Sequence, residues 1–238
     1  MHGPKLPMTL WFWAAYLMAT HSNGISAFQL WRQLGIGSYK TAWLMCAKLR
    51  RAMVNPERSP LSGLVELDDA SIPYHTKAEP PTGSEGRSLQ GKMLIAGAVE
   101  VVGTGPGRVR LSAIKDCSAT SLHAFIAANI APGTVAKTDA WRSYKHAPGV
   151  NHQPEVIRPR LAHTVLPWIH RVFANLKTWA LGVYHSFRRE HLQSYLDEFV
   201  FRFNRRRTRH AAFRTLLGIS TRIPPATYKM LISQEAQG

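Results

Sequence analysis

Apolar residues in the first third of the chain recur at helical spacing. Residues 25–53, "ISAFQLWRQLGIGSYKTAWLMCAKLRRAM", divide into two helices with a tight turn at 35–37. Ser26 and Ser38 stand at the two helix starts, where a hydroxyl oxygen can accept a backbone N–H of the first turn. The second helix has an apolar face made by Tyr39, Ala42, Trp43, Cys46, Leu49 and Met53. The pattern predicts a helix-turn-helix, with an ordinary helical hairpin as the alternative.

The stretch "LWFWAAYLMA" (10–19) is apolar throughout but ten residues long, which is too short to cross a bilayer. It runs into "THSNGIS" without a small-residue cleavage site, so a buried helix is expected here and a signal peptide is the alternative. We expect no association with a membrane. The Pro- and Ser-rich residues 55–63 are typical of a linker.

After the linker the pattern changes to that of strands, with one helix among them. The predicted strands cover 64–74, 92–103, 107–116 and 134–141, and the predicted helix covers 118–130. A Pro-, Gly- and Ser-rich loop at 77–92 follows the first strand, and "TGPG" joins the second and third as a hairpin. Three strands, a helix and a further strand predict a mixed sheet in an α/β fold.

The last third is helical. One apolar stripe is formed by Ile169, Val172, Phe173, Leu176 and Ala180, and a second by Leu192, Tyr195, Leu196, Phe199 and Phe203. The second helix is expected to end in the basic stretch "RFNRRRTRH" (202–210). We interpret this stretch as a tail whose Arg205, Arg206 and Arg207 contact phosphates; a solvated surface is the alternative.

Charge changes the interpretation of these elements. The chain has 30 Lys and Arg against 14 Asp and Glu, a net charge of +16, and a pI of about 10.4. Such an excess favours a polyanionic partner, above all nucleic acid, because neutralising phosphates releases condensed counterions. The second helix of the predicted helix-turn-helix contributes Lys40, Lys48, Arg50 and Arg51. We therefore expect this motif to bind double-stranded DNA.

The chemistry-bearing residues are few. The two cysteines, Cys46 and Cys117, exclude a disulfide framework and a cysteine-based zinc site, and they fit a reducing, cytoplasmic setting. Asp68 lies in the first predicted strand and Asp139 in the fourth, each with apolar neighbours. Two carboxylates beside a packed sheet are the oxygen ligands that Mg²⁺ takes. The alternative is that each caps a turn or pairs with a nearby arginine.

Four segments in this order resemble bacterial insertion-sequence transposases of the DDE superfamily: "VELDDASI", "KTDAWRSYK", "HTVLPWIHRVFANLKTWALGVYH" and "HLQSYLDEFVFRFNRR". The similarity extends from about residue 9 to about residue 220. The most similar branch has a zinc ribbon, a helix-turn-helix and a ribonuclease-H-like core. The resemblance implies a helical DNA-binding region at 1–56, a ribonuclease-H-like α/β core at 57–225 with a mixed sheet flanked by helices, and a tail at 226–238.

The resemblance also assigns residues to the site. Asp68 and Asp139 match the first two metal ligands of the family, and the third comes from a helix, seven residues before the Lys of an "LK" pair. That Lys is Lys177, which places His170 at the third position, and Lys177 itself would contact the DNA backbone. His170 and Lys177 are two turns apart and so share a helix face. Two divalent ions, Mg²⁺ or Mn²⁺, are implied.

Histidine at this position is a departure from the acidic residue of the superfamily. A neutral imidazole can bind a divalent ion but adds no negative charge, and it suits Mn²⁺ better than Mg²⁺. We interpret His170 as a variant ligand; the alternative is a decayed element that has lost its third ligand. Glu66 and Glu155 are possible substitutes, and Glu66, two residues before Asp68, shares its strand face if the strand is regular.

The implied function is metal-dependent cleavage at transposon ends followed by strand transfer to target DNA, by a homo-oligomer assembled on DNA in the cytoplasm at the nucleoid. A catalytically inactive DNA-binding remnant of a transposase is the first alternative. A ribonuclease-H-like nuclease without strand transfer is the second. The cysteine pairs of the zinc ribbon are missing, so the sequence is expected to be a naturally short form or a truncated reading frame, with impaired recognition of DNA ends.

Overall fold

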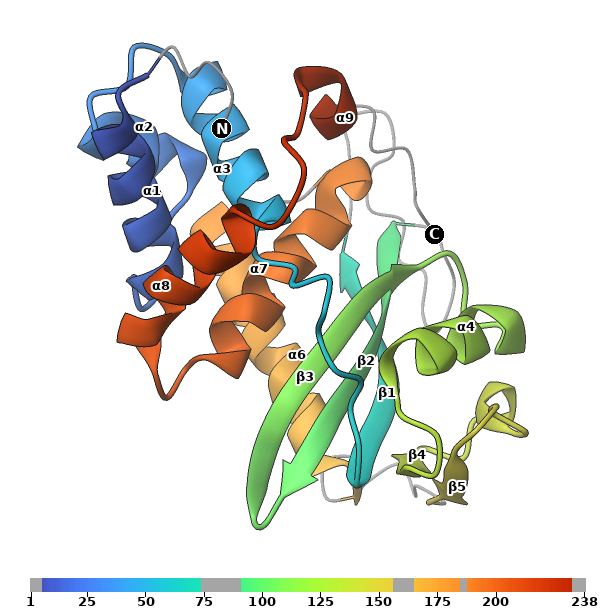
Figure 1. Cartoon of the computed structure of the whole chain (residues 1–238). Coiled ribbons are helices and arrows are strands. Elements are labelled where there is room, and N and C mark those ends of the chain that lie inside the picture. Colours follow the sequence, from blue (N-terminus) through green and yellow to red (C-terminus); the bar gives the residue numbers. More distant parts are fainter. Residues whose placement is uncertain (1–5, 74–90, 156–164, 185–187, 233–238) are drawn as a thin grey trace. The chain divides into compact units, whose positions relative to one another are not determined.

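The computed structural model describes residues 6–73, 91–155, 165–184 and 188–232. The chain forms two compact units (Figure 1). One runs from Ser59 to Thr178, and the other combines the residues up to Arg58 with the helices after Trp179. Most of the predicted loop at 77–92 lies outside the described residues. No helix in the described ranges has the length and apolar character needed to cross a membrane.

A five-stranded sheet forms the centre of the first unit. Its strands are β1 (Leu64–Pro73), β2 (Lys92–Val102), β3 (Gly105–Ile114), β4 (Val135–Thr138) and β5 (Asn151–Pro154). They lie in the order β3-β2-β1-β4-β5; β1, β2 and β3 pair antiparallel, while β4 and β5 run parallel to β1 and to each other. The predicted mixed sheet is confirmed, including the hairpin. The edge strand β5 was not predicted.

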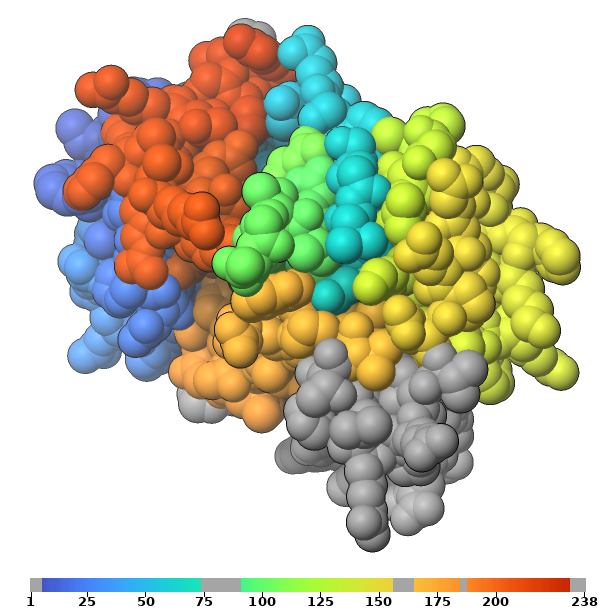
Figure 2. Space-filling view, turned by 90° about the horizontal axis from the view of Figure 1, so that it is seen from below, coloured from blue at the N-terminus to red at the C-terminus, as the bar shows by residue number. Residues whose placement is uncertain are grey.

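Alternation along β1 sends its side chains to two different layers. Val65 and Leu67 are buried in a core shared with helix α4 (Ala119–Asn129). The intervening Glu66 and Asp68 face the opposite side, where helix α6 (Pro167–Trp179) packs. In the space-filling view the light-orange residues of α6 lie against the cyan and green residues of the sheet (Figure 2). The mixed sheet flanked by helices, expected from the resemblance to ribonuclease-H-like cores, is confirmed.

Helices α4 and α6 form for the reasons that the sequence predicts. Ser118 caps α4, since its hydroxyl accepts the backbone N–H of Ser121. Helix α6 presents an apolar stripe to the sheet, with Ile169, Val172, Phe173 and Leu176 buried. A single π-helical turn, η2 (Ala180–Tyr184), follows it.

The second unit is helical. Its helices are α1 (Met8–Thr20), α2 (Ala27–Gln33), α3 (Tyr39–Arg51), η3 (Arg189–His191), α7 (Leu192–Asn204), α8 (Arg209–Ser220) and α9 (Tyr228–Ile232). Both predicted caps of the helical pair are present: Ser26 accepts from Gln29 N and Ser38 from Thr41 N. Gly35 makes the turn between them at φ +60°, a conformation that favours glycine.

The predicted apolar face of α3 needs one correction. Ala42, Cys46, Leu49 and Met53 are buried as predicted, but Tyr39 is 48% exposed. Tyr39 is the first residue of the helix, before the helix enters the core, so its ring packs edge-on against Trp31 at the surface.

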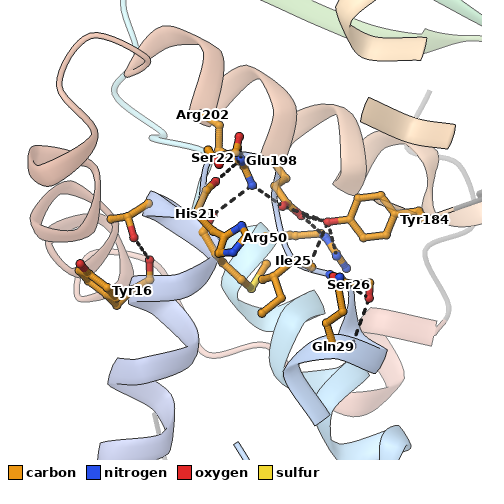
Figure 3. A network of polar contacts seen from close by, with 12 residues as sticks. Tyr16, His21, Ser22, Ile25, Ser26, Gln29, Arg50, Tyr184, Glu198 and Arg202 are labelled. Atoms are coloured by element: carbon orange, nitrogen blue, oxygen red, sulfur yellow. Dashed lines mark hydrogen bonds and ion pairs between the residues drawn. The ribbon is translucent and has the colours of Figure 1, made fainter. Parts of the chain in front are cut away.

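In the core of the helical unit, helices from the beginning of the sequence pack against helices from its last third. Helix α1 packs against α8, and α3 against α7. Within it Arg50 and Glu198, 2% and 0% exposed, form an ion pair with 2.7 Å between Nε and Oε2 (Figure 3). The Tyr184 hydroxyl donates to Glu198 Oε1 at 3.0 Å, and the Arg50 guanidinium lies 4.1 Å from the Tyr195 ring centre. The prediction that Arg50 contributes to a DNA-binding surface was wrong, because its charge is buried.

The basic stretch 202–210 is not a tail. Helix α7 ends at Asn204 and helix α8 begins at Arg209, within the same stretch. Three of its arginines bond to the protein: Arg202 donates to the carbonyl oxygen of His21, Arg205 to that of Phe201, and Arg206 to that of Phe203. The stretch therefore connects two packed helices.

Candidate active site

Strand β1 supplies the first carboxylate of the candidate site. Asp68 is 7% exposed, and its Oδ1 accepts the backbone N–H of Asp69 at 2.8 Å. Its neighbour across the antiparallel pair with β2 is Gly97. Asp68 is thus held by the central strand of the sheet, on the face that α6 covers.

Helix α6 supplies the second group. His170 Nε2 lies 3.8 Å from Asp68 Oδ2, and the histidine side chain is 36% exposed. Lys177, two turns further along the helix, is exposed and lines the same open cavity of about 480 Å³. Asp68, Asp69 and Ser71 form the strand side of this cavity. The structure therefore places Asp68, His170 and Lys177 around one cavity.

Asp139 is placed differently. It follows the last residue of β4, and its Oδ1 accepts the backbone N–H of Trp141 at 3.0 Å, which forms a local turn. Across the described residues, no three side chains of the His, Cys, Asp and Glu types lie close enough together to hold one metal ion. The structure thus brings two of the three predicted ligands into direct proximity and leaves Asp139 outside that pair.

Tyr144 links the three aspartates electrostatically. Its ring is 2% exposed, and its hydroxyl has no hydrogen-bond partner in the described part of the chain. Burial raises the pKa of this hydroxyl well above its usual value, and the carboxylates of Asp69, Asp68 and Asp139 raise it further. The carboxylates of Asp68, Asp69 and Asp139 thus all act on the same buried hydroxyl.

The distance between Asp68 and His170 fits a shared divalent ion. Ligand bonds to such an ion are about 2.1 Å long, so two donors of one ion are at most about 4.2 Å apart. The measured 3.8 Å lies within this limit. One hard oxygen and one imidazole nitrogen suit Mn²⁺ and other transition metals better than they suit Mg²⁺.

The two glutamates considered as substitute ligands have other contacts. Glu66 does share a strand face with Asp68, but its Oε2 accepts the backbone N–H groups of Trp168 and Ile169, each at 2.9 Å. Burial raises the pKa of Glu66, and these two hydrogen bonds oppose the rise. Glu155 is paired with Lys137 at 3.7 Å and is 46% exposed. Neither occupies the place of a third ligand.

Sequence reasoning missed three residues near the site: Asp69, Tyr144 and Gly97. Asp69 lines the cavity and accepts a hydrogen bond from the Cys117 thiol at 3.4 Å. A signal existed for Gly97, since a glycine inside an apolar strand often marks a close approach of another element. For Tyr144, five residues after Asp139, the chain pattern gave no signal.

The residues predicted to bind DNA in the helical unit differ in exposure. Lys40 and Lys48 are exposed, and their Nζ atoms lie 5.0 Å and 5.9 Å from the ring centres of Tyr228 and Trp11. Arg207 is also exposed. Arg205 and Arg206 are half-buried, and burial lowers the pKa of both guanidinium groups. Of the predicted set, Lys40, Lys48 and Arg207 present an exposed charge.

The half-burial of Arg205 and Arg206 has a simple cause. Their guanidinium carbons lie 4.0 Å from the ring centre of Phe201 and 4.1 Å from that of Phe203, respectively. Such stacking is favourable for a cation over an aromatic face. These two arginines therefore cover the end of α7, and their contact with phosphate stays a prediction.

Among curated proteins, no sequence matches the chain. A chain of the simian T-cell lymphotropic virus intasome, solved in complex with the PP2A regulatory subunit B56 gamma, is similar with 11% identity and a TM-score of 0.38. The match covers 71% of this protein, which spans 62% of the intasome chain.

Two Mos1 structures are also similar. The pre-cleavage Mos1 transpososome has 12% identity and a TM-score of 0.32, covering 93% of this chain and 81% of that one. The Mos1 transposase paired-end complex with the left transposon end has 13% identity and a TM-score of 0.35, covering 92% and 81%.

The family assignment comes from the sequence of the sheet unit and the helices that follow it. The family model described as the ISXO2-like transposase domain matches residues 60–204. The matched range begins just before β1 and ends with α7, so it includes Asp68, Asp139, His170 and Lys177. The protein is a member of the ISXO2-like transposase domain family.

Proposed function

We propose that the protein is a DNA transposase that cleaves the ends of its element and joins them to target DNA in a reaction that needs divalent metal ions. The observation that carries this proposal is the 3.8 Å approach of His170 to Asp68 inside an open cavity. Membership of a transposase family and a net charge of +16 support DNA as the partner. Because two ends must be joined, we also propose that a homo-oligomer assembles on the DNA.

Each residue has a distinct part in the proposal. Asp68 and His170 would hold a divalent ion, Asp139 would act with them, and Lys177 would hold a phosphate by its positive charge. When bound, a pair of divalent ions activates the attacking oxygen and stabilises the departing one in phosphodiester cleavage. Asp68, His170 and Lys177 line one cavity that is open to solvent.

Histidine as a ligand has two consequences. The imidazole must be neutral to bind an ion, so metal affinity is expected to fall as the pH is lowered. It also contributes no negative charge, so activity is expected to be higher in Mn²⁺ than in Mg²⁺. Replacing His170 with Glu adds that charge and is expected to raise the activity in Mg²⁺.

The test is cleavage of a DNA duplex that carries the element's own end, read from the DNA flanking the gene. Wild type, His170→Ala, His170→Glu and Asp68→Ala are compared in Mg²⁺ and in Mn²⁺. We expect wild type to cleave, and Asp68→Ala to bind the duplex without cleaving it. His123→Ala is a matched control, because that histidine is on α4, across the sheet from the site.

A catalytically inactive DNA-binding protein is the second candidate. One observation favours it: within the described ranges, no group of three metal-ligating side chains comes together. If wild type binds the end but stays inert in both metals, and His170→Glu is inert as well, this candidate replaces the first. Cleavage without joining to a target duplex would instead indicate a nuclease.

A further inference from the structure

Helix α6 is attached to the sheet by a buried carboxylate from another element. Glu66 on β1 is 4% exposed, and its Oε2 accepts the N–H groups of Trp168 and Ile169 at 2.9 Å. These N–H groups belong to the first turn of α6, where no helical carbonyl is available to accept them. The negative charge also lies at the positive end of the helix dipole. The start of α6 is therefore capped by a strand residue about a hundred positions earlier in the sequence.

The same helix approaches the sheet very closely at a second point. A Cβ atom added to Gly97 would lie 2.6 Å from Cζ of Phe173 and 3.0 Å from Cδ1 of Ile169. Gly97 is the residue paired with Asp68 across β1 and β2. Side chains of α6 thus pack directly on the backbone of β2 beside the candidate metal ligand, and a larger residue at position 97 would have to displace them.

Both contacts lie next to the Asp68–His170 pair. Glu66 is two residues before Asp68 on the same strand face, and the N–H groups that it binds are two residues and one residue before His170. Glu66, which precedes Asp68 on the strand, is therefore joined directly by hydrogen bonds to the two helix residues that precede His170. Any shift of the helix along the strand would change the Asp68–His170 distance and break both bonds.

We propose that Glu66 is a positioning residue, whose carboxylate fixes the first turn of α6 on β1 and thereby sets His170 at the distance from Asp68 that metal binding needs. The expected effect on metal binding rests on the proposed function, whereas the role of Glu66 in fixing the start of α6 does not. Glu66 does not contact the ion or the DNA in this scheme. Groups that orient ligands in this way commonly change metal affinity by about 10–100-fold when they are removed.

The test uses the full chain and two readouts. Mn²⁺ affinity is measured by titration, and exchange of the Trp168 and Ile169 amide hydrogens is measured by mass spectrometry on peptides that cover them. In Glu66→Ala we expect Mn²⁺ affinity to fall about tenfold or more and these amides to exchange faster. Glu66→Gln keeps the volume and one acceptor oxygen, so it should fold as wild type does and rescue both readouts in part.

Glu100→Gln is the matched control. Glu100 is a buried carboxylate of the same sheet, 6% exposed, and it accepts the backbone N–H groups of Ser62 and Arg108, away from α6. The variant Glu100→Gln should lower stability but change neither Mn²⁺ affinity nor amide exchange at the start of α6. Unchanged exchange in Glu66→Ala would overturn the proposal, and so would faster exchange with unchanged Mn²⁺ affinity. If wild type binds no Mn²⁺, the proposed function fails, and the exchange measurement alone decides whether Glu66 fixes the helix.

Discussion

Removing Glu198 should destabilise the helical unit more than any surface substitution. The change Glu198→Ala leaves the Arg50 guanidinium, 2% exposed, without the carboxylate that now lies 2.7 Å from it. It also takes away one acceptor of the Tyr184 hydroxyl, which then keeps the carbonyl oxygen of Ile25 at 3.3 Å. Breaking one side of a buried ion pair typically costs about 3–5 kcal/mol, because the remaining charge stays buried. Domains have a total stability of about 5–15 kcal/mol, so the loss is a large part of it.

The assay is urea unfolding followed by circular dichroism at pH 7. Glu57→Ala is the control, because Glu57 pairs with Arg222 at 3.4 Å at the surface, with the two side chains 73% and 63% exposed. An exposed pair contributes about 0–1 kcal/mol, so this variant should unfold close to wild type. A loss below about 1 kcal/mol in Glu198→Ala would refute the reasoning, since it would mean that Arg50 finds water or another partner. The double change Arg50→Met with Glu198→Leu should be less destabilised than Glu198→Ala, because no charge is left in the core.

Three further results are expected. Gly97→Ala should lower stability by about 1–3 kcal/mol and weaken Mn²⁺ binding. Gly37→Ala is the control and should change neither property, because an added Cβ there meets nothing within 4 Å. Equal effects of the two variants in thermal melts and Mn²⁺ titrations would contradict this prediction. Iodoacetamide should label Cys117 in the native protein and spare Cys46, because burial raises the pKa of the Cys46 thiol to about 12; peptide mapping reads the outcome. Burial raises the pKa of Asp197 to about 6 in the folded state, above its unfolded value near 3.9. The contribution of this carboxyl group to stability should therefore fall as the pH rises from about 4 to 6. Asp197→Asn should therefore raise the melting temperature more at pH 8 than at pH 4, and an equal rise at both would argue against it.

Periodicity predicted most of the fold because most elements bury an apolar face. The two capped helices, the strands of the hairpin and helix α6 each have such a face, so the sequence marks them. Strand β5 has none: it reads Asn-His-Gln-Pro, is largely exposed, and exists because it pairs with β4. Its formation depends on a neighbour distant in sequence, which a local pattern does not contain.

The site was predictable where helix and strand periods determine it. The seven-residue interval places His170 and Lys177 on one face of α6, and the two-residue period places Glu66 and Asp68 on one face of β1. The choice of His170 and Lys177 came from the resemblance to the transposase family. What Glu66 and Arg50 do depends on partners about 100 and 148 residues away. A charged residue in an amphipathic pattern is normally assigned to solvent, so pattern alone placed Arg50 on the wrong side of its helix.

The joining of both chain ends in the helical unit has a consequence for biosynthesis. Helix α3 leaves the ribosome about 140 residues before α7 begins, which at ordinary elongation rates is roughly 7 to 30 s. During this time the nascent chain has Arg50 but not Glu198, and the apolar sides of α1 and α3 lack the helices that cover them. A premature stop codon before α7 would make this state permanent. Such a product is expected to aggregate or be degraded, so a late nonsense mutation would abolish the fold of the N-terminal helices together with the rest and would leave no stable fragment.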